Sequence, residues 1–279
     1  MKASQTVFED GLCFVRWIDY SRLMVFLVIL FFVLGSIFGS FLNVVVDRLI
    51  VGQSILGRSQ CDYCRKVLSP WDLVPVLSFL ILRGKCRYCR RKLSWQYPAV
   101  ESLTGLLFAA TFYLQVVGEN IGLTTLAFLL VITCVMVIVS VVDFKYSLIP
   151  TTFVFGASLL ALFYDFFTLP SGVFIDHVAA AFVAATFFGS IVVLTRGRGM
   201  GSGDIVLAFL IGMVLGFPKM VLSVFVAFVA GSVIAILLLI FGRKRFKQTI
   251  PFGPFLVFGF YIALYWYKPV VSWYVSLFR

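Results

Sequence analysis

Long runs of hydrophobic residues, broken by short polar stretches, recur along the whole chain. The clearest runs are about 20 residues long, the length at which an α-helix crosses a hydrocarbon core of about 30 Å. The sixth is the shortest, because its 14 residues rise only about 21 Å. The pattern predicts about eight transmembrane helices, over residues 23–46, 101–117, 122–142, 149–166, 176–194, 204–217, 219–241 and 253–276.

The composition places the chain in the class of all-α integral membrane proteins. Hydrophobic residues make up 62% of the 279 residues and charged residues only 13%, against about 25% charged residues in soluble domains. Acidic side chains precede the first run, unlike the basic start of a cleaved signal peptide. We therefore expect four parts: an N-terminal segment (1–22), a first transmembrane helix (23–46), a loop (47–100) and a seven-helix membrane domain (101–279).

The positive charges indicate an orientation. Residues 48–98 contain ten Lys or Arg and two Asp, and residues 242–248 add four basic side chains. Lys and Arg are retained on the cytoplasmic side, so both segments are expected there and both termini outside. The net charge is +11, and the basic side chains border membrane spans, where anionic lipid head groups are a sufficient partner. The charge therefore does not indicate a nucleic-acid partner. His177 falls in an expected outer loop with a surface role, and we find no internal repeat.

The loop contains two Cys-x-x-Cys pairs, Cys61 with Cys64 and Cys86 with Cys89, separated by 21 residues. Four thiolates at such spacing can surround one structural Zn(II) tetrahedrally, with no open position for chemistry. Disulfides are the alternative, but thiols stay reduced in the cytoplasm. Cys13 and Cys134 have no partner in the sequence and are expected to be buried or incidental thiols.

Two aspartates stand at ends of hydrophobic runs on the expected cytoplasmic side, Asp143 in "VVDFKYSLIP" and Asp204 in "GMGSGD". An ionisable group at the edge of a membrane span indicates function or pairing. Two neighbouring carboxylates share a proton, so one can activate water while the other protonates the leaving amide. The alternative is that both aspartates cap helices or pair with Lys145, Arg196 or Arg198.

Three glycines, Gly199, Gly201 and Gly203, precede the second aspartate. They are expected to allow backbone conformations closed to other residues and to let a substrate chain approach closely. A dinucleotide-binding loop is excluded, because the spacing differs and no βαβ unit surrounds it. Pro251 and Pro254 either shape a substrate groove or only start the last span.

Six ordered motifs resemble the bacterial type IV prepilin peptidases, an aspartic membrane protease family with the Gly-x-Gly-Asp signature. They are "GSFLNVVVDRL", the paired cysteine motif with "WDLVPVLSFLILRGKCRYC", "YPAVESLTGLLF", Asp143 with "LIP", "GMGSGD" and "PFGPFLVFG". The resemblance implies that Asp143 and Asp204 are the catalytic pair and that the four cysteines bind zinc. Val206 and Thr151 depart from the residues common in the family, which puts substrate preference and rate in doubt.

The resemblance also implies the substrates, a second activity and a location. Prepilins and type II secretion pseudopilins would lose a basic leader peptide at the cytoplasmic face of the bacterial inner membrane, with membrane lipids as the other partners. The new N-terminus would then be methylated with S-adenosylmethionine, for which Glu101, Asn43 and the basic loop are candidate contributors. The sequence does not indicate an oligomeric state or the particular pilins.

Three alternatives stay open beside this one. A presenilin-like intramembrane protease shares the Gly-x-Gly-Asp signature, but lacks the four-cysteine loop and the "PFGPF" context. A transporter could use membrane carboxylates to relay protons or bind a cation. An assembly scaffold organised by zinc would need neither aspartate.

Overall fold

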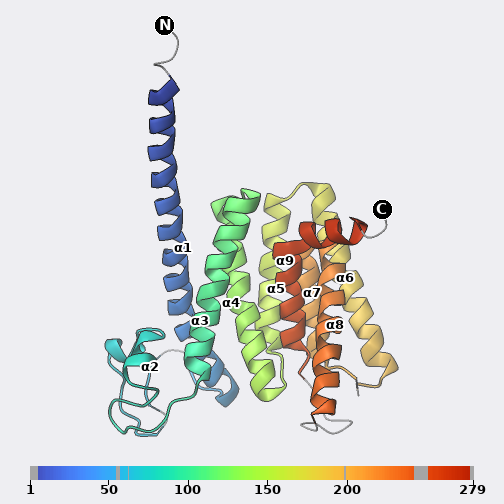
Figure 1. Ribbon diagram of the computed structural model, residues 1–279. Coiled ribbons are helices and arrows are strands. Elements are labelled where there is room, and N and C mark those ends of the chain that lie inside the picture. The colour runs from blue at the N-terminus through green and yellow to red at the C-terminus, as the bar shows by residue number, and fades with distance from the viewer. Residues whose placement is uncertain (1–5, 55–56, 62, 198, 242–250, 277–279) are drawn as a thin grey trace. The chain divides into compact units, whose positions relative to one another are not determined.

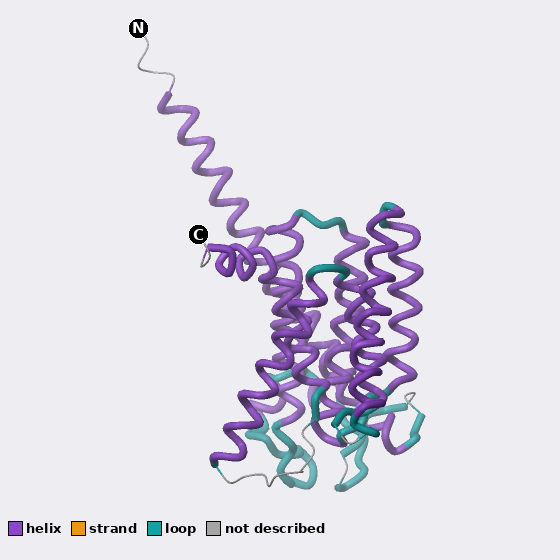
Figure 2. Tube along the Cα trace, turned by 90° about the vertical axis from the view of Figure 1, so that its right-hand side faces the viewer, coloured by secondary structure: helices purple, strands orange, loops and turns teal. Residues whose placement is uncertain are grey.

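The structure is a computed structural model that describes residues 6–54, 57–61, 63–197, 199–241 and 251–276. The side chains of residues 6–20 and 50–51 are also outside the description, and with them the thiol of Cys13. Arg198 and the basic segment 242–248 likewise fall outside the described residues. In the described ranges the chain forms helices and loops, and its only β-structure is two isolated bridges (Figures 1 and 2).

Nine α-helices and two short irregular helices make up the described chain. The first group is α1 (Thr6–Val51), the 3-10 helix η1 (Pro70–Leu73), α2 (Leu77–Ile81), α3 (Gln96–Thr111) and the π-helix η2 (Phe112–Val117). The second group is α4 (Leu123–Tyr146), α5 (Thr151–Thr168), α6 (Ser171–Leu194), α7 (Ser202–Leu215), α8 (Lys219–Ile240) and α9 (Gly253–Ser276).

Each span predicted from the sequence coincides with one of these helices, which confirms the all-α membrane class. Among the described residues, seven helices are long and apolar enough to cross a membrane. The sixth predicted span is α7, which has only 14 residues. Helices suit a bilayer because they satisfy every backbone N–H and C=O internally.

The chain divides into two compact units, Met1–Thr133 and Cys134–Arg279, with the boundary inside α4. In the first unit, α1 packs on α3 through glycines that allow close approach of the two backbones. A methyl group on Gly39 would come within 2.8 Å of the Cα of Glu101, and one on Gly105 within 2.5 Å of the Ser36 hydroxyl. Small residues at helix interfaces are a common packing device in membranes.

In the second unit, the short helix α7 contacts α5, α6, α8 and α9. Eight of its residues are buried, among them Leu207, Leu210 and Met213, so neighbouring helices surround it. Its Gly212 lies so close to Ala181 of α6 that a methyl group there would come within 2.5 Å of the Ala181 Cα. Because α7 is enclosed by protein, it does not need the length of a lipid-facing span.

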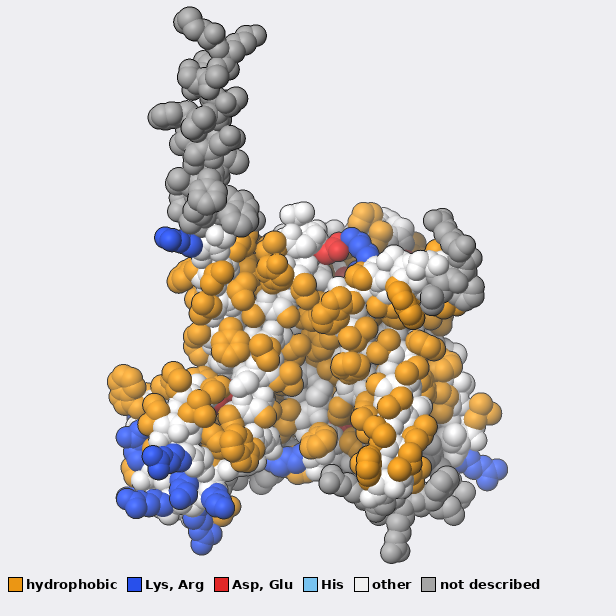
Figure 3. Space-filling model, viewed as in Figure 1, with side chains coloured by type: hydrophobic (Ala, Val, Ile, Leu, Met, Phe, Trp, Pro, Cys, Tyr) orange, Lys and Arg blue, Asp and Glu red, His pale blue; other side chains and the backbone are white. Residues whose placement is uncertain are grey.

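Exposed apolar side chains cover the outward faces of the long helices, as expected for surfaces that contact lipid (Figure 3). Lys and Arg gather instead over the loop that carries the cysteines. This separation of apolar helices from a basic loop matches the charge pattern of the sequence.

Candidate functional site

Asp143 lies in the last turn of α4, and its side chain is only 5% exposed. The backbone N–H of Gly253, the first residue of α9, donates a 2.8 Å hydrogen bond to its Oδ2. A methyl group on Gly253 would lie 2.7 Å from the same oxygen, so the contact requires glycine. Pro251 and Pro254 flank this residue, and Pro254 occupies the first turn of α9, where proline needs no N–H.

Asp204 lies in the first turn of α7 and is 6% exposed. Its two carboxylate oxygens have different surroundings. Oδ2 accepts a 3.0 Å hydrogen bond from the N–H of Gly201, which closes the helix N-terminus as a cap. Oδ1 is buried and has no hydrogen-bond partner among the described residues. The capping alternative from the sequence is therefore right for one oxygen, while the other is left for a further partner.

The two carboxylates are close enough for the charge of Asp143 to act on Asp204. In the described part of the chain, no Lys or Arg forms an ion pair with either of them. A buried carboxylate without a countercharge is costly as an anion. Two such groups near each other favour a state in which they share one proton.

The glycines before Asp204 act differently from the expectation. Neither Gly201 nor Gly203 has a positive φ, so the backbone conformations of these two are open to other residues, and for them that part of the prediction was wrong. Gly203 is required by packing instead: a methyl group there would lie 2.7 Å from the Cβ of Ile149. Ile149 belongs to the "LIP" motif after α4, so this contact holds the start of α7 against the segment that follows Asp143.

The four cysteines of the loop come together in the first unit, and their sulfur atoms all lie within 4.8 Å of one another. Cys61 Sγ and Cys89 Sγ are 3.8 Å apart, far beyond the roughly 2.05 Å of a disulfide. Tetrahedral thiolates at about 2.3 Å from a metal ion stand about 3.8 Å from each other. The cluster therefore fits a four-coordinate metal ion.

The two cysteine pairs are copies of one local structure, which the expectation of no internal repeat missed. In the first pair Cys61 N–H donates to Lys66 O at 3.0 Å, and in the second Cys86 N–H donates to Arg91 O at 2.9 Å. The matching sequence signal is "CDYCRKVLS" beside "CRYCRRKLS". The copies also pack reciprocally.

In this reciprocal packing, the ammonium of Lys66 lies 5.4 Å from the centre of the Tyr88 ring. The guanidinium of Arg91 lies 4.8 Å from that of Tyr63. Each cysteine knuckle therefore places one cation over the aromatic ring of the other, an attraction that helps to hold the pairs together.

The thiols of the cluster differ in acidity. Burial raises the pKa of Cys61, but N–H groups of Cys64 and Tyr63 and neighbouring thiols outweigh it and lower this pKa to about 7. At Cys89 an N–H from Arg91 lowers the pKa, but burial and the neighbouring thiols raise it to about 11. Cys134, in α4, carries a free thiol outside the cluster.

Glu101 and Asn43, the candidates for the methyl-donor site, both lie in the first unit and are 8% and 2% exposed. Oε2 of Glu101 accepts a 2.7 Å hydrogen bond from Val76 N–H. The amide of Asn43 donates to Tyr97 O at 3.2 Å. Asn43 lies one turn after Gly39 on α1, and Glu101 lies one turn before Gly105 on α3. Both residues are therefore near the close contact of the two helices.

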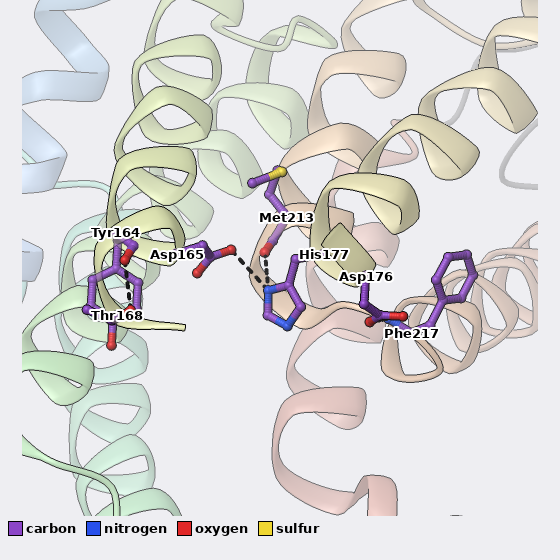
Figure 4. Close-up of polar contacts among 7 residues, drawn as sticks. All are labelled: Tyr164, Asp165, Thr168, Asp176, His177, Met213 and Phe217. Atoms are coloured by element: carbon purple, nitrogen blue, oxygen red, sulfur yellow. Dashed lines mark hydrogen bonds and ion pairs between the residues drawn. The ribbon is translucent and has the colours of Figure 1, made fainter. Parts of the chain in front are cut away.

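His177 does not lie in a loop, as the sequence suggested, but inside α6 (Figure 4). Its Nδ1 is 3.0 Å from Oδ2 of the buried Asp165 and 2.9 Å from the carbonyl of Met213. Both are acceptors, so Nδ1 carries the hydrogen. Beside it Asp176 accepts a 2.9 Å bond from Phe217 N–H. This cluster fixes the end of α7 opposite to Asp204.

The geometry defines a multi-pass helical membrane protein with a buried pair of carboxylates and a four-cysteine loop. Comparison with known families agrees. Residues 33–115 match the bacterial peptidase A24 N-terminal domain, and residues 130–236 match the type IV leader peptidase family. The chain belongs to the type IV leader peptidase family.

Several curated relatives share the prepilin leader peptidase/N-methyltransferase name. That of Bacillus subtilis (strain 168) is 31% identical over 253 residues, covering 88% of this chain and 97% of the relative. That of Aeromonas hydrophila is 30% identical over 278 residues, covering 89% and 94%. That of Pseudomonas putida is 30% identical over 265 residues, covering 84% and 88%. No solved structure matches the chain.

Proposed function

We propose that this protein is an aspartic endopeptidase that removes the basic leader peptide from type IV prepilins and type II secretion pseudopilins, and that it then methylates the new N-terminus. Membership of the type IV leader peptidase family supports both activities, since its relatives are named for both. The observation that carries the peptidase assignment is that the carboxylates of Asp143 and Asp204 are both buried and near enough for one charge to act on the other.

The pair acts on water as a shared acid and base. One carboxylate takes a proton from water, whose oxygen attacks the carbonyl carbon of the scissile peptide bond. The other, protonated carboxyl gives its proton to the amide nitrogen as the C–N bond breaks. One proton enters the pair and one leaves it, so the pair is restored without a covalent intermediate. Gly253 and Gly201 each hold one oxygen by an N–H, which leaves Oδ1 of Asp204 for the shared proton.

Methylation would follow on the product of cleavage. S-adenosylmethionine would supply the methyl group to the new α-amine, and Glu101 and Asn43 are the candidate residues to hold this donor.

The segment 47–100 is proposed as a cytoplasmic zinc-binding loop. Cys61, Cys64, Cys86 and Cys89 would hold one Zn(II), and their sulfur spacing supports this ion. Four thiolates leave no open position, so the metal would organise the loop and take no part in cleavage.

The location follows from charge and from the position of the pair. The basic loop and the end of α4 are proposed to face the cytoplasm at the bacterial inner membrane. A prepilin joins a basic leader to a hydrophobic helix, so a carboxylate pair at the inner interface would meet the bond between them. Anionic lipid head groups would offset repulsion between the basic leader and the basic loop.

The proposal is tested with full-length protein in membranes and a prepilin substrate, by reading the product masses. Asp143→Asn and Asp204→Asn should each lower leader removal by at least about 1,000-fold, since either loses half of the acid–base pair. Asp176→Asn is the matched control: Asp176 belongs to α6, it binds the segment that follows the other end of α7, and the amide oxygen of asparagine can still accept from Phe217 N–H. Full cleavage by the Asp143→Asn or the Asp204→Asn variant would contradict a catalytic role for the substituted residue.

A further inference from the structure

The helix α2 of the cysteine loop is amphipathic, although it has only five residues. Its inward side chains include Ser78 and Phe79, which line a cavity of about 610 Å³ inside the first unit. Its outward side chains are Leu77, Leu80 and Ile81, which are 57%, 60% and 76% exposed. Residues spaced by three and four positions share one face of a helix. One face of α2 therefore presents three large apolar side chains that the rest of the described chain leaves open.

Two tryptophans border this face of α2. Trp71 belongs to η1, which contacts α2, and Trp95 immediately precedes α3. The ring centres of Trp95 and Phe79 lie 4.9 Å apart, so Trp95 stands beside α2. The two tryptophans are 77% and 74% exposed, and an exposed apolar surface of this size marks a site that binds a membrane or another protein. We call these residues the α2 patch: Trp71, Leu77, Leu80, Ile81 and Trp95.

A hydrogen bond fixes the level of α2 along the membrane helices. The N–H of Val76, which immediately precedes α2, donates to Oε2 of Glu101 at 2.7 Å. Glu101 belongs to the candidate span Gln96–Val117. Opposite it on α1, a methyl group on Gly39 would lie 2.8 Å from the Glu101 Cα, and the candidate span of α1 runs on for ten residues, or about 15 Å. The start of α2 is therefore level with residues inside two spans.

The patch also continues an exposed apolar stripe of α3. The stripe follows from the spacing of four exposed residues, Trp95, Ala99, Leu103 and Leu106. Intervals of four, four and three residues place them on one side of the helix. Leu103 and Leu106 lie in the candidate span, where exposed apolar side chains contact lipid. Trp95 therefore stands at the end of a surface that faces acyl chains.

The charged side chains of the loop are arranged in the way that a membrane surface requires. In Figure 3, hydrophobic side chains of the loop gather mostly on the side next to the helices, and Lys and Arg on the far side. Arg83, two residues after α2, is exposed, and such a side chain can reach phosphate groups while its stem lies on apolar surface. Tryptophan is enriched at this level of a bilayer because its ring is amphipathic.

We propose that the α2 patch lies in the interfacial layer of the phospholipid bilayer and anchors the cysteine loop to it. Leu77, Leu80 and Ile81 contact the acyl chains, and the two tryptophans lie among the head groups. Phospholipid is the occupant because the patch is level with the spans and joined to a stripe that faces lipid. The two cysteine knuckles then stand outside the apolar layer. This anchor goes beyond the proposed function and needs neither cleavage nor methylation.

The test is tryptophan fluorescence of the full-length protein in phospholipid vesicles, with and without lipid that carries bromine near the head group. Three proteins with a single tryptophan are compared, in which phenylalanine replaces the other native tryptophans. One keeps Trp71, one keeps Trp95, and the control carries Tyr88→Trp, because Tyr88 is exposed on a cysteine knuckle beside Lys66. Trp71 and Trp95 should each lose at least about half of their emission, and the control less than about a tenth.

A charged substitution tests the apolar face itself. Leu80→Asp in the protein that keeps Trp71 should lower the quenching by at least about two-fold, because a carboxylate is costly in the apolar layer. Gln53→Asp adds the same charge at an exposed position outside the patch and should leave the quenching unchanged. Zinc content and melting temperature show which variants are folded.

The unsubstituted protein provides a second measurement. A phospholipid with a photoreactive acyl chain should label residues 77–81, as read by mass spectrometry of the peptides. Absence of this label would overturn the anchor, as would quenching of Trp71 and Trp95 no stronger than that of the control. Emission from Trp71 that ignores bromine but changes with the ratio of protein to lipid would also overturn it, and would assign the patch to a second copy of the chain.

Discussion

The backbone N–H of Gly253 donates a 2.8 Å hydrogen bond to Oδ2 of Asp143 across 110 residues of sequence. The bond fixes one oxygen of the carboxylate, so the other oxygen is the one that would take part in the proposed cleavage. It also explains why a glycine stands between two prolines at the start of α9.

Gly253→Ala should therefore impair catalysis more than folding. Its methyl group would lie 2.7 Å from the Asp143 oxygen, and must displace the carboxylate or the start of α9. We expect leader removal to fall by at least about ten-fold, since misplacing a catalytic group by about 1 Å costs up to about 100-fold. Steady-state cleavage rates measure this. Gly156→Ala in α5 is the control, because a methyl group there meets nothing within 4 Å.

Metal binding should depend on the four cysteines of the knuckles and on no other thiol. Elemental analysis of the purified wild-type protein should give one zinc ion per chain. Cys61→Ser or Cys86→Ser should remove most of this zinc. Cys134→Ser should retain it, because that residue lies outside the cluster. A wild-type protein purified without zinc would contradict the metal assignment.

Asp72 should stabilise the cysteine loop mainly through hydrogen bonds. Its Oδ2 accepts from the N–H and hydroxyl of Ser69 at 3.2 and 3.0 Å, and its Oδ1 from Arg87 at 2.6 Å. Asp72→Ala should lower the free energy of unfolding of the loop by about 1–3 kcal/mol. Arg87→Ala should cost less, up to about 1 kcal/mol, because its side chain is 49% exposed. Thermal unfolding compares the two.

The carboxyl of Asp72 also makes the stability of the loop depend on pH in the acid range. Burial raises the pKa of Asp72, but the Ser69 and Arg87 contacts outweigh it and hold this pKa below its usual value. A lowered folded-state pKa adds stability above the unfolded value of about 3.9, and that stability is lost as pH falls through the folded value. The stability difference between wild type and Asp72→Asn should therefore shrink below about pH 4. An unchanged difference would contradict this role.

His177 should matter for stability and not for cleavage. His177→Ala would leave the carboxylate of Asp165 buried without its partner, at a cost of about 1–3 kcal/mol. The melting temperature in detergent should fall, while folded protein cleaves at the wild-type rate. His177→Asn should recover part of the loss, because its amide can donate to Asp165. A lower cleavage rate at full stability would place this cluster in the reaction.

The positions of the helices and of both candidate sites could be read from the chain. Apolar runs mark the spans, and the Cys-x-x-Cys spacing is local enough to indicate a metal site by itself. Asp143 and Asp204 stood out because charge is rare at the edge of a span. The similarity of the two knuckles is also a local property of the sequence, visible at Tyr63 and Tyr88.

The sequence by itself determined the candidate membrane spans and the candidate site residues, because helix periodicity, charge and ligand spacing are local properties. Tertiary structure alone decided that Gly253 holds Asp143, that one oxygen of Asp204 caps a helix while the other stays unpaired, and that Gly203 is needed for packing. It also decided that Glu101 holds the start of α2 beside α3. Contacts between distant segments depend on how close helix backbones approach, and the pattern along the chain does not specify that distance.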